Sequence, residues 1–328
     1  MQRTLMIAAC AVLATSVPAG AQTQTTAVEA VSSPAQIDRT TQTEDISFKK
    51  DLNDRMTVPV LLSGRGPYHF LVDTGADRTA ISRDLARTLN YAAGDPASLH
   101  SVTGVSTITT ATVPTLQLTR KEIRNINAPL LEGANMGADG ILGLDSLRSQ
   151  RILFDFGNNV MSIVPSATPD FKAEPGTIVV QGVRRNGRLI LTEATANDHP
   201  VTVVIDTGSE VSIGNAALHS ALLGSKMLTA SGQVDLISVT GARITGDYMF
   251  IRELEIGGIK LKDLAIVFAD AHTFKQLRLD KKPALLLGMN AIRAFKKVSI
   301  DFASHKLRVV VPEESSLDLR LAAAKLTL

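Results

Sequence analysis

The 328-residue sequence predicts a mainly β protein built from two similar halves. Most of its apolar segments are short, rich in Val, Ile and Thr, and bounded by Gly, Pro or Asn, which is typical of strands joined by tight turns. The second observation is an internal duplication, because four short elements recur in the same order. Two copies are too few for a solenoid and fit a two-lobed molecule with pseudo-twofold symmetry.

The duplicated elements can be followed along both halves. Each copy begins with Asp-Thr-Gly at the end of an apolar run. It continues with Ser-Val-Thr-Gly, with two apolar residues and Gly, and with a strand-like segment that contains Asp. These elements start at Asp73, Ser101, Ile141 and Ile152 in the first copy, and at Asp206, Ser238, Leu286 and Val298 in the second. A lone Asp-Thr-Gly is common by chance, so the matched context is what gives the repeat its weight.

The N-terminal segment is typical of a secretory signal. A basic residue precedes an apolar stretch from Leu5 to Val17, and small residues form a cleavage signature at 19–21. Residues 1–21 are therefore expected to be removed on export, which suits a periplasmic protein. The alternative is a lipoprotein signal ending at Cys10, but this residue comes too early and the apolar run continues beyond it.

Cysteine and histidine usage excludes several kinds of site. Cys10 is the only cysteine, so the exported chain is expected to form no disulfide, thiol nucleophile or thiolate metal site. The six His residues are scattered singly, without the spacing of metal ligands, and solvated or turn positions are expected for them. No Gly-rich segment has a phosphate-binding form. The sequence thus predicts neither a metal nor a cofactor.

Charge and hydropathy exclude two kinds of partner. Lys and Arg number 34 and Asp and Glu number 32, and no basic run is interleaved with aromatic residues, so a nucleic-acid partner is not expected. Outside the signal, no apolar run approaches the ~20 residues that a membrane-spanning helix needs.

Composition divides the rest of the chain. Residues 22–45 are rich in Thr, Gln, Ser and Ala, and we expect a flexible linker there. The first lobe is predicted at 46–166 and the second at 167–312, with a Pro- and Gly-containing join between them. Residues 313–328 are expected to form a C-terminal tail with a short amphipathic helix at 315–326, to which we assign no function.

Local patterns predict the elements around each Asp-Thr-Gly. A hairpin with its turn at 63–67 leads into the first copy, and a second hairpin with its turn at Asn197 and Asp198 leads into the other. A helix is predicted to begin after Ser82, whose side chain is a suitable N-cap. Short paired helices are predicted after the two Leu-Gly elements, at 145–149 and 290–295.

The residue types of the repeat suit acid–base chemistry. When two buried carboxyls such as those of Asp73 and Asp206 meet, they cannot both ionise, and a pair that shares one proton supplies a general acid and a general base. The Thr hydroxyl can donate across the axis to the opposite loop. Gly leaves the carboxylate uncrowded. The alternative interpretation, a simple turn after a strand, is disfavoured by the two copies in matched context.

The segment from Phe70 to Ser82 resembles the active-site strand and loop of retropepsin-like aspartic peptidases. Ile141-Leu-Gly143 and Leu286-Leu-Gly288 resemble the element that packs beneath the catalytic loop in that family. The resemblance spans most of 50–312, once per half. It implies a bilobal pseudo-twofold aspartic-peptidase fold, with two retropepsin-like β-barrel lobes and a cleft between them.

The resemblance also implies a role for each matched residue. Asp73 and Asp206 would be the catalytic dyad, with Thr74, Gly75, Thr207 and Gly208 supporting the loops. Asp77 and Glu210 would receive backbone N–H groups of the substrate. The tips of two flaps would bind substrate through Val102, Thr103, Gly104, Val239, Thr240 and Gly241, although ordinary hairpins are the alternative for both segments.

The sequence departs from the family pattern at two places. Retroviral members follow the Leu-Gly element with an Arg-Asn pair whose Arg braces the loop, whereas Leu144-Asp145 and Met289-Asn290 stand in those positions here. The loop must therefore be braced by other residues, or be braced less firmly. Ala76 and Ser209 also differ, and we expect Ser209 to stabilise the ionised form of the neighbouring carboxylate. Asp206 would then ionise more readily than Asp73.

Taken with the resemblance, the sequence predicts an exported aspartic endopeptidase that hydrolyses extended polypeptides at acidic to mildly acidic pH. A water activated between Asp73 and Asp206 would attack the peptide carbonyl, and the protein would be a monomer with an internal pseudo-dimer. One alternative is a non-catalytic periplasmic peptide-binding protein on the same scaffold. Another is an enzyme whose halves pair with a second chain.

Overall fold

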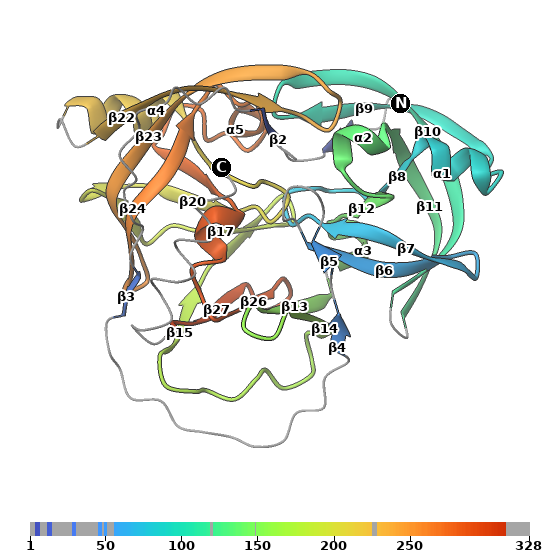
Figure 1. The fold of residues 1–328 in the computed structure, drawn as a ribbon, viewed down its shortest axis with the longest axis horizontal. Helices are drawn as coiled ribbons and strands as arrows, with labels where there is room; N and C mark the ends of the chain where they lie inside the picture. The colour runs from blue at the N-terminus through green and yellow to red at the C-terminus, as the bar shows by residue number, and fades with distance from the viewer. Residues whose placement is uncertain are drawn as a thin grey trace.

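The computed structural model describes residues 56–118, 121–147, 149–224 and 228–312, together with five short strands before residue 56. These are β1 (Thr4–Met6), β2 (Val12–Ala14), β3 (Val28–Ala30), β4 (Asp45–Ser47) and β5 (Lys49–Lys50). Apart from these strands, the expected signal, linker and C-terminal tail lie outside the described residues. Two strand-rich halves stand side by side above a third sheet (Figure 1), which confirms the predicted mainly β, bilobal fold.

The first half is built on a nine-stranded sheet in the order β1-β9-β10-β11-β8-β12-β7-β6-β5. Its main strands are β6 (Met56–Leu62), β7 (Arg65–Val72), β8 (Ala80–Ser82), β9 (Ala93–Ser101), β10 (Gly104–Leu118), β11 (Lys121–Leu131) and β12 (Gly140–Leu142). Its helices are α1 (Arg83–Thr88), α2 (Gly133–Met136) and α3 (Leu144–Leu147). Ser82 caps α1 as predicted, because its Oγ accepts the Leu85 amide at 3.1 Å.

The second half repeats this order on a twelve-stranded sheet. Its strands are β16 (Val183–Arg185), β17 (Arg188–Leu191), β18 (Ala194–Ala196), β19 (His199–Pro200), β20 (Thr202–Ile205), β21 (Ser212–Gly214), β22 (Leu228–Ile237), β23 (Arg243–Ile256), β24 (Ile259–Phe268) and β25 (Ala284–Leu287). Its helices are α4 (Ala216–Gly224), α5 (His272–Gln276) and α6 (Met289–Ile292). Asn215 caps α4 through its Oδ1, which accepts the Leu218 amide at 2.8 Å.

The Leu-Gly elements lie at the centre of each half. β12 runs parallel to β7 and antiparallel to β8, while β25 runs parallel to β20 and antiparallel to β21. Each of these central strands is therefore flanked by the strand that leads into Asp-Thr-Gly and the strand that leaves it. This pairing positions the intervening loop from both sides.

A six-stranded sheet joins the two halves, in the order β15-β27-β26-β13-β14-β4. It contains β13 (Gln150–Asp155), β14 (Val160–Pro165), β15 (Thr177–Gln181), β26 (Lys297–Asp301) and β27 (Lys306–Val310). The middle strands β13 and β26 are antiparallel, with Leu153 opposite Ser299. Ion pairs of 3.9 Å between Arg151 and Asp301 and of 3.6 Å between Lys297 and Asp155 lie on either side of that point.

The distribution of buried apolar side chains matches this arrangement of two halves on a shared sheet. The largest apolar cluster of the described residues takes side chains from both halves and from the shared sheet, including Phe70, Phe154 and Phe302. Burial of such side chains stabilises the fold by about 25 cal/mol per Å² of apolar surface. Among the described helices, none is long and apolar enough to cross a membrane.

Candidate active site

The two Asp-Thr-Gly turns meet between the halves. Asp73 follows β7 and Asp206 follows β20, and their side chains are 0% and 1% exposed. The Asp73 amide donates to Leu142 at 3.1 Å, and the Asp206 amide donates to Leu287 at 3.0 Å. The sheets therefore deliver both carboxyls to one buried point by the same backbone contacts.

Reciprocal hydrogen bonds lock the two turns together. The Thr74 hydroxyl donates to the carbonyl of Ile205 at 3.0 Å, and the Thr207 hydroxyl donates to the carbonyl of Val72 at 2.7 Å. Each hydroxyl also accepts the amide of the opposite Thr, at 3.0 and 3.1 Å. Four bonds thus cross between segments far apart in the sequence, which is the interlocking that the resemblance implied for these residues.

In each carboxyl, one oxygen accepts a backbone hydrogen bond and the other has no partner among the described residues. Asp73 Oδ1 accepts the Gly75 amide at 2.7 Å, and Asp206 Oδ1 accepts the Gly208 amide at 3.1 Å. The two Oδ2 atoms are buried, and neither has a hydrogen-bond partner in the described part of the chain. A Cβ at Gly208 would lie 2.2 Å from Asp73 Cγ, so only Gly allows the second turn to approach this carboxyl so closely.

Burial raises the pKa of both carboxyls, and the two are not equivalent. The pKa of Asp73 lies well above its usual range, because desolvation is reinforced by the charge of Asp206. Burial raises the pKa of Asp206 to about 6, a shift opposed first by the Arg188 guanidinium and then by the Gly208 amide. Asp206 is the more readily ionised member, the direction expected from the sequence.

The reason proposed for this asymmetry was wrong. The Ser209 hydroxyl does not reach a carboxylate, because it donates to the carbonyl of Val211 at 2.7 Å. The largest effect that lowers the pKa of Asp206 comes instead from Arg188.

Arg188 is a site residue that the sequence interpretation missed. It begins β17 in the second half and its side chain is 0% exposed. Its Nη1 lies 3.0 Å from Asp77 Oδ1 in the first half, and its Nη2 donates to the carbonyl of Gly75. Arg188 therefore ties the second half to the Asp-Thr-Gly turn of the first, and it places a positive charge near both carboxyls.

The two residues predicted to bind substrate backbone are both ion-paired. Asp77 keeps 29% of its side chain exposed beside Arg188. Glu210 lies in the equivalent position and is only 14% exposed, with its Oε2 3.3 Å from Arg293 Nη1. The equivalent positions thus differ in accessibility as well as in length.

Asp145 and Asn290 supply the bracing that the sequence left open. Asp145 Oδ1 accepts the Thr79 amide at 2.9 Å and the Thr79 hydroxyl at 2.8 Å. Asn290 Oδ1 accepts the Ser212 amide at 2.9 Å and the Ser212 hydroxyl at 2.8 Å. In each half, one side chain after the Leu-Gly element therefore fixes the segment after Asp-Thr-Gly.

The predicted flap segments form hairpins that meet each other. The tip between β9 and β10 contacts the tip between β22 and β23, since Thr103 Oγ1 donates to Ser238 Oγ at 3.2 Å. A further bond joins Ser238 and Thr240 through their hydroxyls at 2.6 Å. Gly104 and Gly241 have φ angles of 139° and 81°, which suit the turns.

The flap valines do not face a substrate cleft. Val102 is fully buried in an apolar cluster of the second half, with Val204 and Phe274. Val239 is fully buried in a cluster of the first half, with Ala76 and Met136. In this structure neither valine side chain is open to substrate, because each is buried in an apolar cluster of the opposite half.

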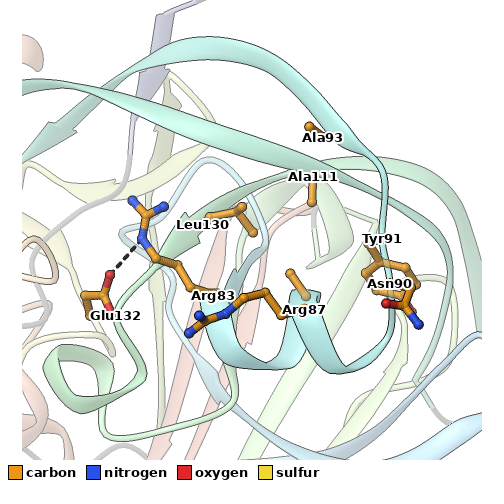
Figure 2. Close-up of a pocket in the computed structure, with 9 residues that line it drawn as sticks. Arg83, Arg87, Asn90, Tyr91, Ala93, Ala111, Leu130 and Glu132 are labelled. Atoms are coloured by element: carbon orange, nitrogen blue, oxygen red, sulfur yellow. Dashed lines mark ion pairs between the residues drawn. The ribbon is translucent and has the colours of Figure 1, made fainter.

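The described residues contain no cluster of three or more His, Cys, Asp or Glu side chains that could hold a metal ion. A pocket of about 840 Å³ lies elsewhere, against α1 (Figure 2), and is lined by none of the dyad or hairpin-tip residues. Arg83 in this pocket pairs with Glu132 at 2.7 Å.

Comparison with known families agrees with this geometry. Residues 58–149 match the gag-polyprotein aspartyl protease family, and residues 192–291 match a second aspartyl protease family. Each match contains one Asp-Thr-Gly turn and one Leu-Gly element. The chain therefore belongs to the retropepsin-like aspartic peptidases, with two such domains in tandem. A search of curated proteins finds no match to the chain.

Proposed function

We propose that the protein is an aspartic endopeptidase that hydrolyses peptide bonds with a water held between Asp73 and Asp206. The observation that carries this proposal is the pair of buried Oδ2 atoms with no described protein partner, on turns locked together by four threonine hydrogen bonds. A buried polar atom normally has a partner, and a water between two carboxyls would supply it.

The unequal pKa values assign the roles within this mechanism. Asp206, the more readily ionised carboxyl, removes a proton from the water as its oxygen attacks the carbonyl carbon. Asp73 holds the other proton and donates a hydrogen bond to the developing oxyanion. When the tetrahedral intermediate collapses, the C–N bond breaks and a carboxyl returns a proton to the leaving amine.

The proposed substrate is an extended polypeptide. In the structure, the valine of each hairpin tip belongs to an apolar cluster of the opposite half. One cluster includes Ala76, which directly follows the first Asp-Thr-Gly turn, and the other includes Val211, which follows the second. Withdrawal of the tips would expose an apolar surface on each side of the dyad, which suits apolar side chains around the cleaved bond. The freed hairpin backbone would then pair with the substrate as added strands do. The signal-like N-terminus supports action outside the cytoplasm.

Cleavage of an unfolded protein between pH 3 and 8, with the fragments mapped by mass spectrometry, tests this proposal. Asp73→Asn and Asp206→Asn are expected to abolish cleavage, and pepstatin is expected to inhibit the wild type. Asp198→Asn removes an exposed carboxyl as a matched control and should cleave normally. Absence of cleavage by a folded wild type that retains bound peptides would favour the peptide-binding alternative.

A further inference from the structure

Two histidines from different halves meet at the base of the first hairpin tip. His100 is the penultimate residue of β9, and His272 is the first residue of α5. Their rings stack with centroids 5.2 Å apart, and His100 Nδ1 lies 2.9 Å from His272 Nε2. The sequence suggested isolated histidines, but these two, 172 residues apart, form a contact between hairpin and opposite half.

Two more contacts strengthen the same junction. The His272 amide donates to the carbonyl of Val102 at 2.8 Å, directly beside the buried valine tip. The terminal amide of Gln276, one turn further along α5, lies against His100 Nδ1 and 3.3 Å from His272 Nε2. Backbone, amide and imidazole contacts therefore hold the first hairpin down on α5.

The second hairpin has no equivalent pair. The duplicated Ser-Val-Thr-Gly segments align Ser101 with Ser238, so Ile237 stands where the first hairpin has His100. The histidine contact is thus a property of one hairpin and is not required by the fold of both.

The hydrogen bond between the rings limits how many protons the pair can hold. At 2.9 Å only one hydrogen fits between two facing ring nitrogens, so one ring must donate and the other accept. A neutral or singly protonated pair meets this condition. A doubly protonated pair cannot, because each nitrogen then carries a hydrogen and both rings are positive.

The charged groups around the pair do not offset the repulsion between two positively charged rings. Burial and the His272 ring lower the pKa of His100. Burial and the Lys275 ammonium lower the pKa of His272, while Asp270, itself 2.8 Å from Lys275, acts weakly in the opposite direction. Val105 lies opposite His100 on β10, and β1 beside it, part of the segment expected to be removed on export, contributes no titratable residue.

We propose that His100, His272 and Gln276 form a pH-operated clasp that holds the first hairpin over the dyad and releases it when both rings are protonated. The direction of this pH effect follows from the thermodynamic linkage between proton binding and hairpin release. In a released hairpin each histidine would titrate near 6.5, higher than in the clasp, so protons bind preferentially to the open form. The open population therefore grows as the pH falls below about 6.5.

Combined with the proposed peptidase function, the clasp explains how a sealed dyad becomes active. Opening admits water and substrate to carboxyls that are now 0% and 1% exposed. Because burial is the largest cause of their raised pKa values, hydration lowers both values and keeps the pair singly protonated at acidic pH. At neutral pH the hairpin would remain closed and exclude substrate.

Hydrogen exchange of the full chain between pH 7.5 and 4.5, corrected for intrinsic rates, tests the clasp without using activity. In the wild type, protection of amides 101–106 should fall at least tenfold from pH 7 to pH 5. His272→Gln and His100→Gln should show low protection at both pH values, with less than a twofold change. His199→Gln, on the short strand β19 elsewhere in the second half, should behave as wild type.

The same measurements on an Asp206→Asn background separate the histidines from the dyad, and the tenfold fall should persist there. Cleavage assays form the second arm, in which His272→Gln should cleave at pH 7 at least fivefold faster than wild type. If no variant cleaves at any pH, the proposed peptidase function fails while the exchange data still decide the clasp. Wild-type protection that does not change with pH, or that changes equally in His272→Gln, would overturn the clasp.

Discussion

Arg188 of the second half and Asp77 of the first form an ion pair of 3.0 Å beside the first Asp-Thr-Gly turn. The arginine is completely buried and also binds the carbonyl of Gly75, so a single side chain couples the position of one turn to the opposite half. Its guanidinium opposes the rise in pKa that burial causes in the carboxyls of Asp73 and Asp206. Arg188 is thus a positioning residue with a structural and an electrostatic role.

Arg188→Met should therefore change both stability and pH dependence. Loss of a buried ion pair typically costs 3–5 kcal/mol, and because Asp77 is partly hydrated we expect a loss of about 2 kcal/mol here. The pKa of Asp206 should rise above about 6, which moves the acid limb of the kcat/KM profile upward in pH. Urea unfolding and the pH profile measure the two effects.

Arg185→Met is the matched control, because Arg185 is an exposed arginine on the neighbouring strand β16. It should leave both measurements unchanged. A loss of stability in Arg188→Met without any movement of the acid limb would limit Arg188 to a structural role.

Thr74→Val should weaken the contact between the two turns. The substitution keeps the shape of the side chain but removes the donor to Ile205 and the acceptor of the Thr207 amide. An unsatisfied buried group costs about 1–3 kcal/mol, so stability should fall by that amount and kcat should fall more than KM changes. Thermal unfolding and steady-state kinetics measure these effects.

Thr202→Val, on the strand that leads into the second turn, provides the control for Thr74→Val. The double variant Thr74→Val, Thr207→Val should cost less than the sum of the single variants, because the four bonds form one network. Strict additivity would argue that the two hydroxyls act independently.

The parts of the site that sequence could predict are those fixed by local pattern and duplication. Asp73 and Asp206 end apolar runs, and the same runs form β7 and β20. Ser82 has the side chain and position of an N-cap, and it caps α1. Helix α4 was not predicted, although Asn215 supplies its cap and Leu218 and Leu222 lie on one buried face.

The parts that sequence could not predict depend on pairing between distant segments. Arg188 lies 113 residues from the carbonyl it binds, and nothing in its local sequence indicates a buried arginine. His100 and His272 likewise meet only because one hairpin tip enters the opposite half. The duplication could indicate that two hairpins exist. It could not show that the tip valine of each hairpin is buried in the opposite half.

Gly143→Ala should prevent correct assembly of the first Asp-Thr-Gly loop. A Cβ at this position would lie 2.4 Å from the carbonyl carbon of Arg78, which belongs to backbone that cannot move aside easily. We expect destabilisation of more than about 3 kcal/mol, or failure to fold. Urea unfolding measures the change, and limited proteolysis identifies a variant that fails to fold.

The matched control is Gly133→Ala in α2, where a Cβ would make an ordinary contact at 3.5 Å with Ser82. This change should cost little or be slightly stabilising. Equal stability of the two alanine variants would contradict the close-packing explanation of the Leu-Gly element.

Asp206→Asn should remove activity but increase stability at neutral pH. The pKa of Asp206 is about 6 in the folded protein and about 3.9 in an unfolded chain. Between these values the folded state binds more protons, so its stability falls as the pH rises. The difference corresponds to about 3 kcal/mol by pH 7, and Asn carries no charge to desolvate.

Unfolding in urea at pH 4, 5, 6 and 7 measures this effect. Asp206→Asn should match wild type at pH 4 and exceed it by about 3 kcal/mol at pH 7, whereas Asp280→Asn, at an exposed position, should follow wild type throughout. If Asp206→Asn instead followed wild type at every pH, the carboxyl would have to be hydrated while the hairpins are closed. The closed hairpins would then not be what raises the pKa of the dyad.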